Sequence, residues 1–357
     1  MFNLKSKKSV SALLALLIAV SCLVSCQGDK GEISSAGEGS VTESSVSVEN
    51  TENTENTESF EESVESSEID DPNVHKCTPV EDYFTNVPYV GLYNADTLEA
   101  YYTENATQRL YPASQTKLVT AQVAVKYGDL NEIYYIGSEL NLVKPGSSAF
   151  GLRKGMSMTL EHLLYGLLLP SGNDAAYSIA VNVARKHSGN PNLSDTEAVN
   201  YFCGLMNDFC KEIGANNSNF TNPEGWDDDN QYTTVEDLAI IMSHALKNET
   251  VAKIMATPNI KFLVHSGETF NVPNSNKLIK ESSQYYNAAV IGGKTGFTDY
   301  AGICLTAAFV IDGTTYIGIA DKCPDDAVRY TTVTDLIYLA TDIQTFGRLG
   351  KFCINCE

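Results

Sequence analysis

Basic residues are scarce in this sequence. Its 357 residues include 24 Lys and Arg against 45 Asp and Glu, which gives a formal net charge of −21 at pH 7. Proteins that bind a nucleic-acid backbone need a clustered basic surface, so this balance excludes nucleic acid as a partner. Histidine is scarce too: the five histidines show no metal-ligand spacing such as His-Glu-x-x-His, and neither a metal nor another cofactor is expected.

The N-terminus lacks an apolar run of the roughly 20 residues that a membrane-spanning helix needs. The apolar run Ala12–Val20 is shorter and follows three lysines within residues 5–8, which is the order of an export signal. An uncleaved single-span anchor is the less favoured alternative, because Ser21 and Ser25 interrupt the apolar stretch. Residues 1–25 are therefore predicted to be a signal peptide.

The signal peptide ends in a candidate lipidation motif. Residues 23–26, Leu-Val-Ser-Cys, resemble the lipobox of bacterial lipoproteins, in which the chain is cut before the Cys and that Cys receives a lipid. Cys22 is a weaker second candidate. The resemblance implies an extracytoplasmic protein that is tethered to the outer face of a bacterial cell membrane through a lipid on Cys26.

Large apolar residues are nearly absent from residues 26–74, which consist mostly of Ser, Glu, Thr, Asn and Gly. Such a segment cannot bury a core, so it is predicted to be a disordered acidic linker that acts as a spacer. A functional acidic binding tail is the alternative. The folded domain is predicted at residues 75–350, followed by a C-terminal tail at 351–357.

The folded region has strand patterns at both ends and helical patterns between them, which predicts an α+β domain whose two chain ends share one antiparallel sheet. Asp312-Gly313 is a strong hairpin signal, and Thr233 with Glu236 has the order of a capping box. Strands are predicted at 89–93, 98–102, 288–291, 301–311 and 315–320, and helices at 117–127, 160–169, 175–186, 196–213, 235–246 and 325–344.

The segment 112–117 places a serine hydroxyl and a lysine amine three residues apart at the start of a predicted helix. Ser114 and Lys117 then lie on one helix face and can form a nucleophile with its own base. A lysine accepts a proton at neutral pH only if burial or a nearby cation lowers its pKa from about 10.4, so a second cation is expected nearby. Taken alone, Ser-x-x-Lys is more typical of an exposed helix surface than of a catalytic site.

Two further segments contain candidate functional residues. Ser171 and Asn173 lie in a Ser-Gly-Asn turn between two predicted helices. They are either ordinary turn residues, or functional residues in which Ser171 relays a proton and the Asn173 amide binds a substrate carbonyl. Residues 292–298 close a predicted strand with small residues, which allow a peptide to lie against the strand edge. Lys294 in this segment would be the second cation.

The three motifs Ser-x-x-Lys, Ser-x-Asn and Lys-Thr-Gly occur in this order in penicillin-binding proteins and serine β-lactamases. Over roughly residues 80–345 the sequence resembles the low-molecular-mass D-alanyl-D-alanine carboxypeptidases in particular. This resemblance implies a DD-peptidase/β-lactamase-like fold, with a five-stranded antiparallel sheet flanked by helices and an inserted helical subdomain. Glu224 and Trp226 depart from the family, which more often has His and Leu there. The matching phrases are 112–117, 171–176, 222–228, 232–239 and 293–298.

The resemblance also implies a mechanism without a cofactor. Ser114 attacks the carbonyl of the penultimate D-alanine of a peptidoglycan stem peptide, the terminal D-alanine leaves, and water hydrolyses the acyl-enzyme. Lys117 accepts the serine proton, while Ser171 and Asn173 relay a proton and hold the substrate. The backbone N–H groups of Ser114 and Phe297 form the oxyanion hole. The protein would also bind β-lactams as covalent inhibitors.

The resemblance assigns a second set of residues to substrate binding. Lys294 and Thr295 would contact the substrate carboxylate, and Arg329 lies where relatives often have an Arg for the same carboxylate. A plain surface Arg on the last helix is the alternative for Arg329. The full substrate-binding set is Lys294, Thr295, Gly296, Phe297 and Arg329.

Two alternatives to the carboxypeptidase stay open at this point. A serine β-lactamase is disfavoured because the second motif is Ser-Gly-Asn instead of Ser-Asp-Asn, and because the Glu-x-x-Leu-Asn of class A enzymes is missing. Without that deacylating Glu, hydrolysis of the acyl-enzyme is expected to be slow. A lipoprotein that only binds muropeptides or β-lactams is disfavoured because a pure binder needs neither Ser114 nor Lys117.

Overall fold

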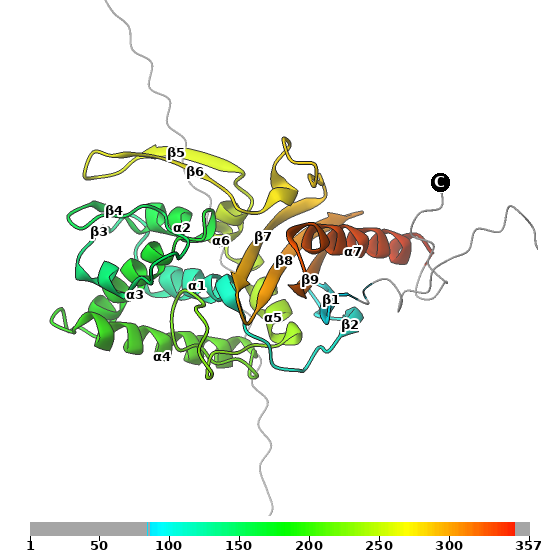
Figure 1. Ribbon diagram of the computed structural model, residues 1–357, viewed down its shortest axis with the longest axis horizontal. Coiled ribbons are helices and arrows are strands. Elements are labelled where there is room, and N and C mark those ends of the chain that lie inside the picture. Colours follow the sequence, from blue (N-terminus) through cyan, green and yellow to red (C-terminus); the bar gives the residue numbers. More distant parts are fainter. Residues whose placement is uncertain (1–83, 85, 347–357) are drawn as a thin grey trace, which may run out of the picture. The chain divides into compact units, whose positions relative to one another are not determined.

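The computed structural model describes residue 84 and residues 86–346 (Figure 1). Its central element is a five-stranded antiparallel sheet with the order β2-β1-β9-β8-β7. Two strands come from the start of the domain and three from its end, so the predicted sharing of one sheet by the two chain ends is confirmed. The strands are β1 (Tyr89–Asn94), β2 (Ala100–Glu104), β7 (Val290–Thr298), β8 (Gly302–Ile311) and β9 (Thr314–Cys323).

The tight turn from β8 to β9 sets the register of two inner strands of the sheet. Asp312 and Gly313 have φ angles of 47° and 81°, and a two-residue hairpin turn with positive φ at both positions matches the right-handed twist of the strands. On the other side of β8, β7 continues well past the predicted 288–291 strand, and Lys294 pairs with Thr306. The third motif therefore lies inside a strand that β8 holds along its length.

Helices cover both faces of the sheet. α7 packs against one face of β8 and β9, and α5 packs against the other face. Helices α1 to α4 form the expected helical subdomain beside the sheet (Figure 1). The helices are α1 (Lys117–Tyr127), α2 (Leu160–Leu168), α3 (Asn173–His187), α4 (Asp195–Ile213), α5 (Val235–Lys247), α6 (Glu249–Met255) and α7 (Asp326–Phe346).

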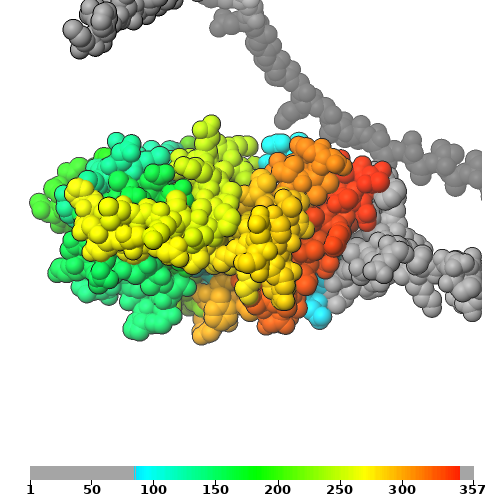
Figure 2. Space-filling model, turned by 90° about the horizontal axis from the view of Figure 1, so that it is seen from above, coloured from blue at the N-terminus to red at the C-terminus, as the bar shows by residue number. Residues whose placement is uncertain are grey.

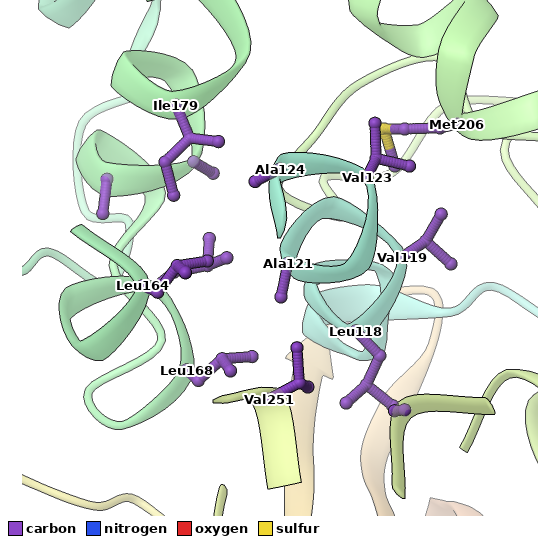
Figure 3. Close-up of a cluster of buried hydrophobic side chains, with 14 of the residues drawn as sticks. Leu118, Val119, Ala121, Val123, Ala124, Leu164, Leu168, Ile179, Met206 and Val251 are labelled. Atoms are coloured by element: carbon purple, nitrogen blue, oxygen red, sulfur yellow. The ribbon is translucent and has the colours of Figure 1, made fainter. Parts of the chain in front are cut away.

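Helix α1 is the buried centre of the helical subdomain. Every residue from Lys117 to Ala124 is buried, so this part of the helix has no solvent face. Each fully buried aliphatic side chain contributes roughly 1.5–3 kcal/mol, and this packing fixes α1 and the lysine at its first position. Figure 3 shows the side chains that surround α1 from four other helices: Leu164, Ile179, Met206 and Val251.

Two small antiparallel sheets are absent from the sequence-based prediction. Their strands are three to five residues long, which is too short for a clear alternation of apolar and polar residues. The hairpin of β5 and β6 and the residues that follow it run along the face seen in Figure 2, drawn in yellow. The strands are β3 (Ile133–Tyr135) with β4 (Ser157–Thr159), and β5 (Asn259–Leu263) with β6 (Thr269–Pro273).

Helix α5 begins at the predicted Val235, but its N-cap differs from the prediction by one residue. Its N-cap is Thr234, whose hydroxyl accepts a hydrogen bond from Asp237 N at 3.1 Å. The predicted capping box of Thr233 and Glu236 is therefore wrong. Two adjacent threonines offer the same capping chemistry, and only the backbone conformation at Thr234 decides between them.

Several predictions concern residues outside the described part of the chain. These are the signal peptide at 1–25, the lipid on Cys26, the acidic linker at 26–74 and the tail at 351–357. Within residues 84 and 86–346, no helix combines the length and the apolar character needed to cross a membrane.

Candidate active site

Ser114 lies where the sheet meets the helical subdomain. It belongs to a short 3₁₀ helix, Ala113–Thr116, which runs directly into α1. Lys117 Nζ donates a hydrogen bond to Ser114 Oγ at 2.7 Å, so the structure brings the two predicted residues together. Ala113 has a φ of 45°, which is strained for a residue with a side chain. Such strain persists where the surroundings enforce it, and it clusters at active sites.

Two glycines let other segments approach the backbone of Ser114. Gly225 has a φ of 94°, and a Cβ there would lie 1.7 Å from Ala113 O. At Gly296 in β7, a Cβ would lie 3.0 Å from Ala113 Cβ and 3.4 Å from Ser114 N. The first position excludes any side chain and the second has no room for one without a shift. Both segments therefore pack closely against the backbone at Ala113 and Ser114.

Lys117 is enclosed in protein. It is completely buried, and its Nζ also donates a hydrogen bond to the backbone oxygen of Glu224 at 2.6 Å. Burial lowers the pKa of Lys117 from 10.5 to about 7, whereas the carboxyl groups of Glu224 and Asp174 act in the opposite direction. The neutral amine is thus accessible near neutral pH, as a base for a serine hydroxyl requires.

Ser171 and Asn173 lie in the turn between α2 and α3. Ser171 has a φ of 65°, and Asn173 is the first residue of α3. The carboxylate of Asp174 fastens this turn to the neighbouring loop, because it accepts hydrogen bonds from four backbone N–H groups at 2.8–2.9 Å. The donors are Phe150, Gly151, Leu152 and Ala175.

Lys294 connects β7 to the second motif. Its Nζ donates hydrogen bonds to Ser171 Oγ at 2.9 Å and to Thr295 O at 2.8 Å. Burial, and after it the positive charges of Lys117 and Arg329, lower the pKa of Lys294 well below 10.5. Lys294 was expected to lower the pKa of Lys117 by its positive charge. In the structure, burial lowers the pKa of Lys117, and the positive charge of Lys117 contributes to the lowered pKa of Lys294.

A cavity of about 170 Å³ opens onto Ser114. Asn173 and Phe297 are among its lining residues, and Phe297 is 63% exposed. Asp227 closes the cavity on one side, because its carboxylate accepts a hydrogen bond from Thr298 Oγ1 at 2.6 Å. Residues 84 and 86–346 contain no group of three or more His, Cys, Asp and Glu side chains that could hold a metal ion.

Arg329 reaches the third motif from the side of α7. It is only 8% exposed, and its Nη1 donates hydrogen bonds to Gly296 O at 3.3 Å and Cys304 O at 3.2 Å. Its other terminal nitrogen is paired with Asp326. The alternative of a plain surface Arg is therefore wrong. The guanidinium instead adds positive charge behind the strand that carries Lys294.

Motif-based reasoning assigns no role to two residues that the structure places at the site. Glu224 is 1% exposed, and its Oε1 accepts a hydrogen bond from the hydroxyl of Tyr177 at 2.9 Å. Tyr177 lies one turn after Asn173 on α3. The sequence contains one signal for Glu224: it is an acidic residue within segment 222–228, at a position where the family more often has His.

The lowered pKa of Lys117 predicts the pH dependence of acylation. Below pH 7 the amine is protonated and cannot accept the serine proton, so the rate should fall about tenfold per pH unit and level off above pH 7. The measurement is the second-order rate constant for penicillin labelling between pH 5 and 9. A rate that is flat from pH 5 to pH 7 contradicts the assignment of Lys117 as the base.

The fold and this site together define a class: the proteins in which a serine paired with a lysine forms an acyl-enzyme, the penicillin-binding proteins and serine β-lactamases. Within that class, residues 90–320 match the family described as D-alanyl-D-alanine carboxypeptidase, peptidase S11, and the chain belongs to this family. The resemblance found in the sequence motifs is thereby confirmed.

Individual relatives agree with this assignment. D-alanyl-D-alanine carboxypeptidase DacF of Bacillus subtilis is 32% identical over 220 residues, which cover 61% of this chain and 52% of DacF. DacA of Escherichia coli is 30% identical over 254 residues, which cover 68% of this chain and 57% of DacA. The chain thus spans about half the length of the curated relatives it matches.

The predicted fold is confirmed by solved structures. The crystal structure of the Streptomyces K15 DD-transpeptidase superposes with a TM-score of 0.64 at 28% sequence identity. The alignment covers 71% of this chain and 95% of that chain. The five-stranded sheet with its helical subdomain is therefore the DD-peptidase/β-lactamase-like fold.

Proposed function

We propose that this protein is a serine-type D-Ala-D-Ala carboxypeptidase, which removes the terminal D-alanine from peptidoglycan stem pentapeptides through an acyl-enzyme on Ser114. The observation that carries the proposal is the 2.7 Å contact between Lys117 Nζ and Ser114 Oγ inside a buried site. Family membership supports the choice of a D-Ala-D-Ala substrate. β-Lactams would acylate the same serine.

Acylation starts with transfer of the Ser114 hydroxyl proton to the neutral amine of Lys117. As Oγ bonds to the carbonyl carbon of the penultimate D-alanine, the backbone N–H groups of Ser114 and Phe297 stabilise the charge on the carbonyl oxygen. One such donor is worth about 2.7–4 kcal/mol at the transition state. The close approach of Gly296 to Ser114 N supports this pairing of donors.

The leaving group and the substrate carboxylate use the second and third motifs. Ser171 passes a proton to the amine of the departing D-alanine, and the amide of Asn173 donates to a substrate carbonyl. The terminal carboxylate binds at Lys294 and Thr295, with Arg329 adding positive charge behind them. Because a carboxylate favours the ammonium form of a nearby lysine, binding raises the lowered pKa of Lys294.

The proposal is tested by two parallel assays on the full chain. One is intact-mass spectrometry after reaction with a fluorescent penicillin, and the other is release of free D-alanine from diacetyl-Lys-D-Ala-D-Ala. A stable adduct that maps to Ser114, together with D-alanine release, is the expected result. Rapid loss of the adduct with drug hydrolysis and no D-alanine would indicate a β-lactamase, and no adduct would favour a binding protein.

We also propose that the protein is exported and held at the outer face of a bacterial membrane by a lipid on Cys26. Expression of the full chain with a radiolabelled fatty acid should give a labelled protein, and Cys26→Ala should lose that label and leave the membrane fraction. The matched control is Cys22→Ala, which should keep the label. Loss of the label in Cys22→Ala, with retention in Cys26→Ala, reverses the assignment.

A further inference from the structure

Glu224 is a buried carboxyl group beside the nucleophile. It lines the same cavity as Ser114 and Asn173. Its backbone is fixed from two directions, because its carbonyl oxygen accepts a hydrogen bond from Lys117 and the next residue, Gly225, lies against Ala113. The carboxyl group is therefore part of the site and not of its rim.

Glu224 and Asn173, which both line this cavity, each have one buried acceptor atom without a donor in the described part of the chain. Glu224 Oε1 is bonded to the Tyr177 hydroxyl, but Glu224 Oε2 and Asn173 Oδ1 accept no hydrogen bond from any of the described residues. A buried acceptor without a donor costs about 1–3 kcal/mol. A water molecule offers the O–H donors that such acceptors need and occupies about 30 Å³, which the cavity of about 170 Å³ can hold.

The charge around Glu224 suits a proton acceptor. Burial raises the pKa of Glu224, which makes the carboxylate a stronger base than an exposed one. The positive charge of Lys117, the hydrogen bond from Tyr177 and the positive charge of Lys144 act in the opposite direction and favour the ionised form. Lys117, which contacts Ser114, and Glu224, which lines the same cavity as Ser114, are thus two groups at this site that can accept a proton.

Resting on the proposed function, we propose that Glu224 accepts the proton of the water that hydrolyses the acyl-enzyme, while Asn173 Oδ1 accepts the other O–H of that water. The water oxygen bonds to the acyl carbon as its proton moves to Glu224 Oε2. The bond between this carbon and Ser114 Oγ then breaks, and the proton on Glu224 returns to Oγ through Lys117. The product leaves as a carboxylic acid that ionises in solvent.

This proposed role differs from the expectation based on motifs. The missing Glu-x-x-Leu-Asn suggested that no carboxylate serves deacylation, whereas Glu224 supplies one from the 222–228 segment. The same step acts on a penicillin ester, so the lifetime of the penicillin adduct reports on Glu224. It does so separately from formation of the adduct, which depends on Lys117.

The test compares the wild-type full chain with Glu224→Gln. The amide keeps the size of the side chain and an acceptor for the Tyr177 hydroxyl, but it cannot take up a proton. Adduct formation should stay within about threefold of wild type, whereas adduct loss should slow about 100-fold or more. For the peptide substrate, kcat and KM should fall together, because the acyl-enzyme accumulates.

Three further variants separate proton uptake from packing. Asp299→Asn removes an exposed carboxylate from the lining of the same cavity and should leave adduct loss unchanged. Tyr177→Phe disturbs the packing of Glu224 but keeps its charge, and it should slow adduct loss less than threefold. Glu224→Asp keeps a carboxylate and should recover part of the rate that Glu224→Gln loses. Melting temperatures verify that each variant is folded.

The outcomes distinguish this inference from the proposed function. Equal adduct lifetimes in wild type and Glu224→Gln would overturn the role of Glu224, and so would equally slow adduct loss in the Gln, Asp and Tyr177→Phe variants. Equal slowing of formation and loss in Glu224→Gln would also overturn it. Failure of the wild type to form an adduct would instead refute the proposed function.

Discussion

Ser114→Ala should abolish covalent labelling by penicillin and lower D-alanine release by about 10⁴-fold or more. Loss of the Oγ atom removes the group that is proposed to form the acyl-enzyme, and with it the hydroxyl that the Lys117 amine contacts. The measurements are intact-mass spectrometry of the penicillin reaction and release of free D-alanine. The fold should be unaffected, because Ser114 is only partly buried.

The matched control for this prediction is Ser148→Ala. Ser148 is an exposed serine that lines the same cavity, and its variant should keep both labelling and D-alanine release. A covalent adduct that persists in Ser114→Ala at wild-type stoichiometry would overturn the assignment of the nucleophile.

Lys117→Met should slow acylation about 10²–10⁴-fold while leaving the fold intact or more stable. The methionine side chain fills the space of the aliphatic part of Lys117 at the start of α1. The substitution also removes an amine whose burial costs stability. Activity and stability are thus expected to change in opposite directions, which a defect in folding does not produce. Stopped-flow labelling and thermal melting measure the two quantities.

Lys126→Met is the control on the same helix. Lys126 lies near the far end of α1, is partly exposed and is paired with Glu212 at the surface. Its replacement should leave acylation unchanged. If Lys117→Met and Lys126→Met both acylate at a rate near that of the wild type, Lys117 is not the base.

Much of the fold could be predicted because its signals are local. The bounds of α1 follow from a continuous apolar pattern, and the structure begins and ends this helix at the predicted residues, Lys117 and Tyr127. The turn at Asp312-Gly313 follows from the conformational freedom that these residues provide. The three motifs also contain every residue that the structure places within hydrogen-bonding distance of Ser114 Oγ or Lys294 Nζ.

The parts that could not be predicted depend on contacts between distant segments. Glu224 belongs to a loop that becomes part of the site only when Gly225 packs against Ala113. Arg329 is one turn into α7, and its burial depends on the carbonyl groups of two strands that lie beneath it. The cause of the lowered pKa of Lys117 is enclosure by other helices, which the Ser-x-x-Lys spacing does not contain.

The pairing of β1 with β9 has a consequence for when the domain can fold. Tyr89 pairs with Asp321, so the sheet closes only after almost the whole domain has been synthesised. Contacts between such distant residues form slowly, because the chain between them must first be ordered. Ser114 is made early and Lys294 late, and the two meet only when the sheet is complete. A chain that has not completed this sheet therefore cannot hold Lys294 beside Ser171, and the site is complete only at the end of folding.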